Sequence, residues 1–169
     1  MFTMNPTQWV GIAAFVLAGL SGWIAGKYSA NRMWQWSGAV YGVLAVDVAI
    51  GLRHQLQGVV RSLAMDQGLY DIRRSYQPIL IIGILLASVL IFYWMWRSQR
   101  RADPIFGVYV SFMLITALFL VEIVSVHAVD AMLYRPVGSI LMIGLLWTIA
   151  VVPHVFCAGW QIAIARRRR

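Results

Sequence analysis

Long runs of apolar residues, separated by short polar segments, follow one another along the chain. A helix needs about 20 residues to cross the hydrocarbon core of a bilayer, where each backbone polar group must be hydrogen-bonded within the protein. Five runs have about this length, at residues 8–26, 33–53, 78–96, 105–127 and 137–161. The pattern therefore predicts an all-α, polytopic integral membrane protein, in which residues 1–169 form a single five-helix transmembrane bundle.

The segment between the second and third spans, residues 54–77, has a different pattern. Apolar residues recur at helical spacing across its start, at Leu52, Leu56, Val59, Val60 and Leu63. This stripe predicts an amphipathic helix that prolongs the second span or lies on the membrane surface. Arginine binds phosphate or carboxylate through forked hydrogen bonds, so Arg61, Arg73 and Arg74 are candidate anion-binding residues. The alternative is a collar that anchors lipid headgroups.

Composition supports a membrane protein independently of the pattern. Hydrophobic residues make up 61% of the chain and charged residues 12%, whereas soluble domains have roughly half and a quarter. The single cysteine, Cys157, excludes a disulfide framework within one chain. The net charge of +8 comes from residues at the ends of the apolar runs, which indicates lipid headgroups and topology rather than nucleic acid.

The distribution of basic residues predicts the orientation. If the N-terminus is outside, the inside segments hold nine Lys and Arg residues and the outside segments five. The positive-inside rule then favours an outside N-terminus and an inside C-terminus. We expect a multi-pass protein of a bacterial inner membrane.

Acidic residues at membrane depth are the strongest indication of a functional site. Of the six Asp and Glu residues, four lie in or beside a span: Asp47, Asp103, Glu122 and Asp130. Ionisable groups in a bilayer cost several kcal/mol each, so such groups are functional candidates.

Two helical stripes give these candidates a geometry. Asp47 and His54 are seven residues apart, and Arg61 follows seven later, so the three share a helix face. On the fourth span, Glu122, His127 and Asp130 fall within about 140° of arc, with Ser125 beside Glu122. Both stripes approach the outer side. We expect them to face each other in a polar site.

The plainest hypothesis for this site is a structural ion-pair network. The carboxylates of Asp47, Glu122 and Asp130 would be balanced by arginines, namely Arg53, Arg61, Arg73 and Arg74. A second hypothesis is an enzyme that processes a lipid or phosphate, in which His127 with Asp130 or Glu122 binds a metal or forms an acid and base pair.

A third hypothesis is a haem b subunit in electron transport, with His54 and His127 as axial ligands. Five spans with an outside N-terminus resemble, in topology, the cytochrome b membrane subunits of respiratory oxidoreductases. That resemblance implies two haems and four histidine ligands, whereas the chain has three histidines, the third being His154. For His154, which follows Pro153, the plain interpretation is a hydrogen-bonded histidine at a helix kink.

Small residues predict one helix contact. Gly22 and Gly26 on the first span, and Gly38 and Gly42 on the second, have the Gly-x-x-x-Gly spacing that lets helices approach closely. We expect these two spans to pack as a hairpin. The chain is short and lacks a complete catalytic constellation, which favours a non-enzymatic accessory subunit or binding component of a membrane assembly. Its expected partners are membrane lipids and other membrane subunits or further copies of itself.

Overall fold

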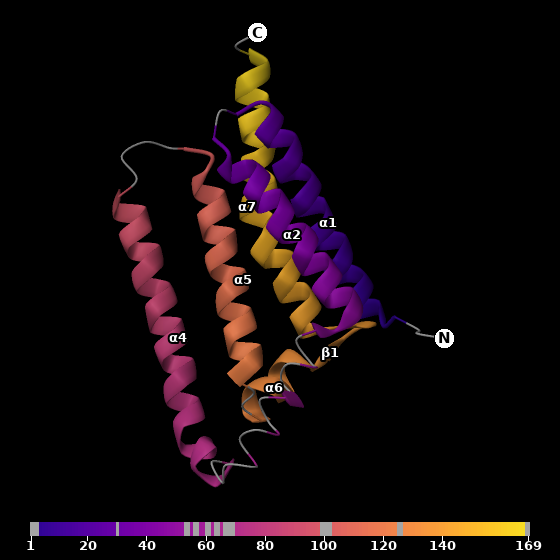
Figure 1. The fold of residues 1–169 in the computed structure, drawn as a ribbon, viewed down its shortest axis with the longest axis vertical. Helices are drawn as coiled ribbons and strands as arrows, with labels where there is room; N and C mark the ends of the chain where they lie inside the picture. The colour runs from indigo at the N-terminus through magenta and orange to yellow at the C-terminus, as the bar shows by residue number, and fades with distance from the viewer. Residues whose placement is uncertain are drawn as a thin grey trace.

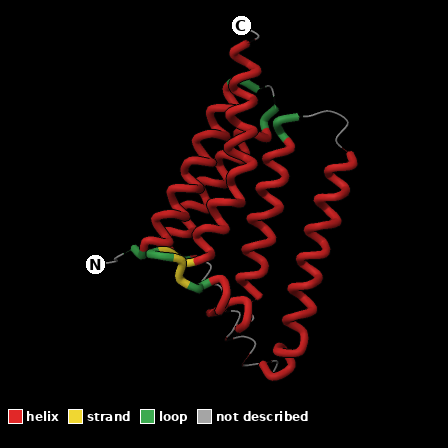
Figure 2. The backbone as a smooth tube through the Cα atoms, turned by 180° about the vertical axis from the view of Figure 1, so that it is seen from behind, coloured by secondary structure: helices red, strands yellow, loops and turns green. Residues whose placement is uncertain are grey.

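The computed structural model describes residues 4–29, 31–52, 55, 58–59, 62, 65, 70–98, 103–124 and 127–167. These residues are mostly helical, as predicted (Figure 2). The elements are α1 (Pro6–Lys27), α2 (Met33–Ile50), α4 (Tyr70–Ser98), α5 (Phe106–Val124), α6 (His127–Leu133), β1 (Pro136–Val137), β2 (Ile140–Leu141) and α7 (Met142–Arg167).

The five long helices alternate in direction along the chain (Figure 1). α1, α2, α5 and α7 form a bundle, and α4 lies outside it, against α5. One end of the bundle, here called the hairpin end, carries β1, β2, α6 and the beginnings of α1, α4 and α7. The other end, here called the turn end, carries the turn between α1 and α2 and the C-terminus.

Two of the described helices, α1 and α7, are long and apolar enough to cross a membrane. The length and composition of these two helices are the features that suggest membrane association. Shorter apolar helical stretches occupy Pro78–Trp94 and Phe106–Glu122.

Several boundaries differ from the sequence prediction. α4 begins at Tyr70, so Pro78 lies inside the helix rather than at its start. α5 ends at Val124, and the short helix α6 follows. The strands β1 and β2 pair antiparallel around Gly138, whose φ of 65° favours glycine, and α7 begins after them. Of the predicted amphipathic segment, residues 54–77, the last eight belong to α4, and the isolated positions described between residues 55 and 65 have helical backbone. The rest of the segment lies outside the described residues.

The contact between α1 and α2 follows the predicted glycine seam. A Cβ atom on Gly38 would lie 2.9 Å from the carbonyl oxygen of Gly19, and one on Gly22 would lie 3.0 Å from that of Trp34. Only residues without a side chain allow the two backbones to approach so closely. The predicted packing of α1 against α2 is therefore confirmed, and Gly19 also lies at this contact. Gly42 was predicted in the same seam, but a Cβ atom there would meet nothing within 4 Å.

An aromatic cluster joins all four helices of the bundle. Phe15 of α1 is fully buried, and its ring lies 6.1 Å from Tyr41 of α2, 6.4 Å from Phe119 of α5 and 6.1 Å from Trp147 of α7, between centroids. Such ring pairs add about 0.5–1.5 kcal/mol each beyond the area they bury. The cluster therefore sets the axial positions of the four helices relative to one another.

The β1–β2 hairpin is hydrogen-bonded to the start of α1. The backbone N–H of Leu141 donates to the hydroxyl of Thr7, at 2.9 Å. Asn5 caps α1 through the backbone N–H of Thr7, and the side chain of Gln8 accepts from the backbone of Asn5. The N-terminal cap of α1 and the β1–β2 hairpin therefore stabilise one another.

Candidate functional site

Two of the predicted acidic residues are buried at the hairpin end. Asp47 lies in the last turn of α2 and is 7% exposed, and Glu122 lies in the last turn of α5 and is 5% exposed. The hydroxyl of Tyr134, which follows α6, donates to Oε1 of Glu122 at 2.9 Å. α6 thus folds back over the end of α5, and Asp130, within α6, is half-buried.

The two carboxylates lie at different distances along the bundle axis from the contact between Tyr41 and Ser111. Tyr41 of α2 contacts Ser111 of α5, which gives a common level for the two helices. At 1.5 Å per residue, Asp47 lies about 9 Å and Glu122 about 17 Å from that level, both towards the hairpin end. The two acids therefore share one end of the bundle, with Glu122 nearer to its surface.

Other predicted residues of this site are described only in part. His54, Arg53, Arg61 and Ser125 lie outside the described residues, and His127, Arg73 and Arg74 are placed as helical backbone positions. The shared polar pocket between the second and fourth spans therefore stays a prediction. So do the haem hypothesis, with its ligands His54 and His127, and the metal hypothesis for His127 and Asp130. Among the described residues, no group of three or more His, Cys, Asp and Glu is placed to hold a metal ion.

A second polar cluster, which we call the central cluster, lies deeper in the bundle. It consists of Tyr41, Ser111 and His154, all fully buried. The hydroxyl of Ser111 donates to the carbonyl oxygen of Ala150 at 2.6 Å, so the Tyr41 hydroxyl donates to the Ser111 oxygen. This chain of hydrogen bonds connects α2, α5 and α7.

His154 connects the central cluster to α1. Its Nε2 lies 3.1 Å from the carbonyl oxygen of Ala18. Because a carbonyl only accepts hydrogen bonds, this geometry requires the proton on Nε2 and leaves Nδ1 as an acceptor. Nδ1 is buried and has no hydrogen-bond partner among the described residues. The imidazole ring lies between Trp34 and Tyr41, at centroid distances of 5.5 and 4.8 Å.

Pro153 explains why α7 takes a hydrogen bond from another helix near the central cluster. A proline inside a helix removes one backbone hydrogen bond and disturbs the turn before it. The Ser111 hydroxyl bonds to Ala150, in that turn. On the same side, α5 approaches closely at Gly107, where a Cβ atom would lie 2.6 Å from the Cβ of Cys157. Pro153, Ser111 and Gly107 together set how α5 and α7 pack.

The plain interpretation of His154 is confirmed in part. It is a hydrogen-bonded histidine beside a proline, but its partner is Ala18 of α1 rather than a carbonyl freed by the kink. Sequence reasoning did not single out Tyr41 or Ser111. The signal that was present is the helical spacing of Val108, Ser111 and Ile115, which puts a serine on the buried face of α5.

Comparisons with protein-family models, with curated proteins and with solved structures each find no match to this chain. The chemistry of the site therefore has to be argued from its own residues. The central cluster is suited to a structural role, since the hydroxyls of Tyr41 and Ser111 and the Nε2 of His154 hydrogen-bond to groups within the bundle. The acids at the hairpin end are suited to hold a hydrogen-bond donor or a cation.

Proposed function

We propose that this chain is a small multi-pass protein of a bacterial inner membrane that acts as a non-enzymatic subunit or binding component of a membrane assembly. In this proposal the five long helices cross the bilayer, the hairpin end faces outside and the C-terminus faces inside. The acidic site of α2 and α5 is then on the outer side.

The observation that carries the proposal is the exposure of α4. Among the described elements, its substantial packing partner is α5 alone. Large apolar side chains are more than half exposed on its other sides, including Ile82, Leu85, Leu86, Val89 and Leu90. A contiguous apolar surface of this kind marks a contact with lipid or with another protein.

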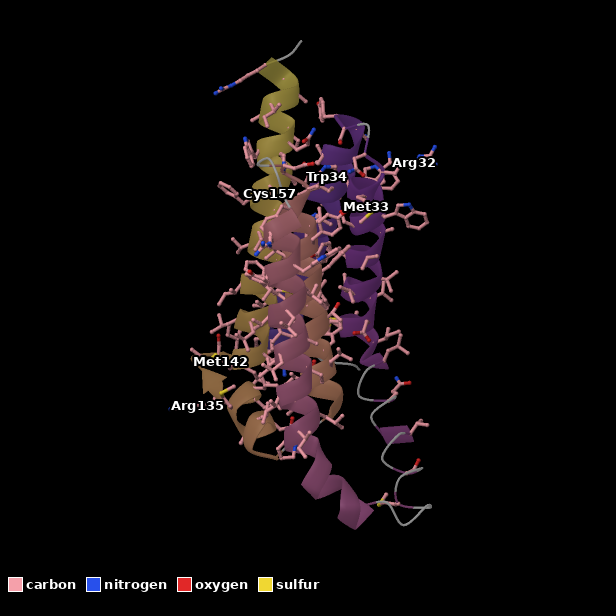
Figure 3. All side chains as sticks on the ribbon, turned by 90° about the vertical axis from the view of Figure 1, so that its left-hand side faces the viewer. Arg32, Met33, Trp34, Arg135, Met142 and Cys157 are labelled. Carbon is pink, nitrogen blue, oxygen red and sulfur yellow. The ribbon has the colours of Figure 1, made fainter. Side chains whose placement is uncertain are left out.

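Charge at the two ends supports the proposed orientation. The described basic residues at the turn end are Lys27, Arg32, Arg97, Arg166 and Arg167. Figure 3 shows Arg32 and Arg135 at opposite ends of the bundle. A concentration of basic residues at one end is what the positive-inside rule associates with the cytoplasmic side.

Cysteine labelling tests the orientation. In a Cys157→Ala background, Ser139→Cys reports on the hairpin end and Ser29→Cys on the turn end. We expect a membrane-impermeant maleimide, added to intact spheroplasts, to label the first variant and to label the second only after the membrane is permeabilised. Labelling of Ser29→Cys in intact spheroplasts would contradict the proposed orientation.

Purification in mild detergent from the native membrane tests the subunit role. We expect a stoichiometric membrane partner to co-purify with the tagged chain. Leu86→Trp, on the exposed side of α4, should lower the yield of that partner, and Ile149→Trp, equally exposed on α7, should leave it unchanged. A chain that purifies alone would argue against the role.

A further inference from the structure

A long apolar groove lies between α4 and α5. It has a volume of about 570 Å³ and runs along α4 from Ile79 to Ile91 and along α5 from Tyr109 to Leu120. Two small residues of α4, Gly83 and Ala87, line the groove one helical turn apart. An added Cβ atom on Gly83 would meet nothing within 4 Å. The groove is therefore open space along the side of the bundle.

The length and position of the groove match one leaflet of a bilayer. The thirteen residues of helix from Ile79 to Ile91 extend over about 18 Å, and half of the hydrocarbon core is about 15 Å. Its lower limit, Ile79, follows Pro78, where the apolar run of α4 begins at the hairpin end. Its upper limit lies about 8 Å short of Trp96, where that run ends. The groove thus starts where the apolar run of α4 begins, at the hairpin end, and stops short of the other end of that run.

Two arginines lie in the first turns of α4, on the hairpin-end side of the groove. α4 is helical from Tyr70, so Arg73 and Arg74 lie about 8–9 Å beyond Ile79 along the helix axis. The headgroup layer on one side of a bilayer is about 5–8 Å deep. Asp71 belongs to the same helical stretch, and the two arginines outnumber it.

We propose that this groove holds one acyl chain of an anionic phospholipid, whose phosphate binds to Arg73 and Arg74. The groove has the apolarity and the length that an acyl chain requires, and the pair of arginines supplies the charge that a phosphate requires. The placement of the phospholipid in the outer leaflet rests on the proposed function. Its binding to the purified protein does not.

Native mass spectrometry of the full chain in detergent tests the proposal, with phosphatidylglycerol and phosphatidylcholine of identical acyl chains as probes. We expect one tightly held phosphatidylglycerol per chain. The double variant Arg73→Gln/Arg74→Gln should bind it about 10- to 30-fold more weakly, because each arginine near a headgroup contributes roughly a fivefold change. Arg97→Gln, at the other end of α4, should bind it as the parent does.

A second pair of variants tests the groove itself. Ala87→Trp places a large side chain in the groove and should abolish retention of phosphatidylglycerol, whereas Val89→Trp, on an exposed side of α4 away from the groove, should not. Equal binding of the two lipids, or unchanged binding in Ala87→Trp, would overturn the proposal. So would a lipid-free parent that forms a dimer disrupted by Ala87→Trp, since a helix of a second copy would then occupy the groove. A result against lipid binding would not change whether a partner co-purifies with the chain. The phospholipid proposal and the subunit proposal can therefore be contradicted independently.

Discussion

At the scale of single residues, the bundle depends on a few buried polar side chains that hydrogen-bond to another helix. Ser111 bonds to α2 and to α7 at once, and His154 bonds to α1. Such bonds orient helices because the alternative in an apolar interior is an unpaired polar group. The central cluster thus specifies the rotation of each helix about its own axis.

Removing the serine should cost more than removing the tyrosine hydroxyl. Ser111→Ala leaves the Tyr41 hydroxyl and the Ala150 carbonyl without their partner, and we expect the free energy of unfolding in micelles to fall by about 1–3 kcal/mol. Tyr41→Phe leaves Ser111 bonded to Ala150 and should cost about 1 kcal/mol. A denaturant titration of both variants and of the double variant measures the coupling. Strictly additive losses would show that the two hydroxyls do not interact.

At the scale of secondary-structure elements, packing is set by glycines at helix crossings. Gly19, Gly22 and Gly38 set the crossing of α1 and α2, and Gly107 sets that of α5 and α7. A methyl group at Gly22, Gly38 or Gly107 would collide with a neighbouring helix, and one at Gly19 would make a tight contact of 3.2 Å with the Gly38 carbonyl oxygen. A methyl group at Gly42 or Gly159 would meet nothing within 4 Å. The glycines described in the helices therefore divide into those that determine packing and those that do not.

Gly107→Ala should destabilise the protein by about 1–3 kcal/mol, because the new methyl group would overlap Cys157 and force α5 away from α7. Gly159→Ala is the matched control, and it should be neutral or stabilising by up to about 1 kcal/mol through helix propensity. Thermal unfolding of both variants in the same detergent checks the contrast. A similar melting temperature for the two would mean that the crossing is looser than its geometry indicates.

Much of the element scale could be predicted from the sequence. Apolar length located the helices, and Gly-x-x-x-Gly spacing located the contact between α1 and α2. The beginning of α4 was not predicted, because Pro78 resembles a helix start although a helix can continue through it. The strands β1 and β2 were missed because residues 137–141 were assigned to the start of the last span, and because two residues per strand are too few for an alternating pattern.

The candidate site was less predictable. The sequence identified Asp47 and Glu122 because acids in apolar runs are rare, and both prove to be buried. The pairing of Tyr41 with Ser111 could not be predicted, because common uncharged residues give no signal until the helices are rotated against each other. The partner of His154 was also beyond reach, since it is a backbone carbonyl 136 positions away.

At the scale of the whole molecule, the bundle and α4 differ in how firmly they are held. The aromatic cluster, the glycine seam and the central cluster all lie within α1, α2, α5 and α7. α4 faces the apolar groove on one side and is exposed on the others. A peripheral helix with so few buried contacts should open at a lower free energy than the bundle.

Hydrogen exchange in detergent micelles measures this difference. We expect the amides of residues 79–94 to exchange sooner than those in the middle of α1 and α7, because opening α4 breaks fewer buried contacts. Added phosphatidylglycerol should slow exchange in α4 and leave α1 unchanged. Equal protection of α4 and α1 in the absence of lipid would contradict a two-part stability.

The collection of positive charge at the turn end also affects how the membrane potential acts on the protein. A bacterial inner membrane is negative inside, and moving one elementary charge through 100 mV changes the free energy by about 2.3 kcal/mol. In the proposed orientation, the five described basic side chains at that end lie on the electrically negative side. Three described basic residues, Arg73, Arg74 and Arg135, lie at the hairpin end. An inverted molecule would therefore hold more of its positive charge on the positive side, so an energised bilayer discriminates electrically between the two insertions. Vesicles that carry a potassium diffusion potential should therefore incorporate the chain with a stronger directional bias than depolarised ones.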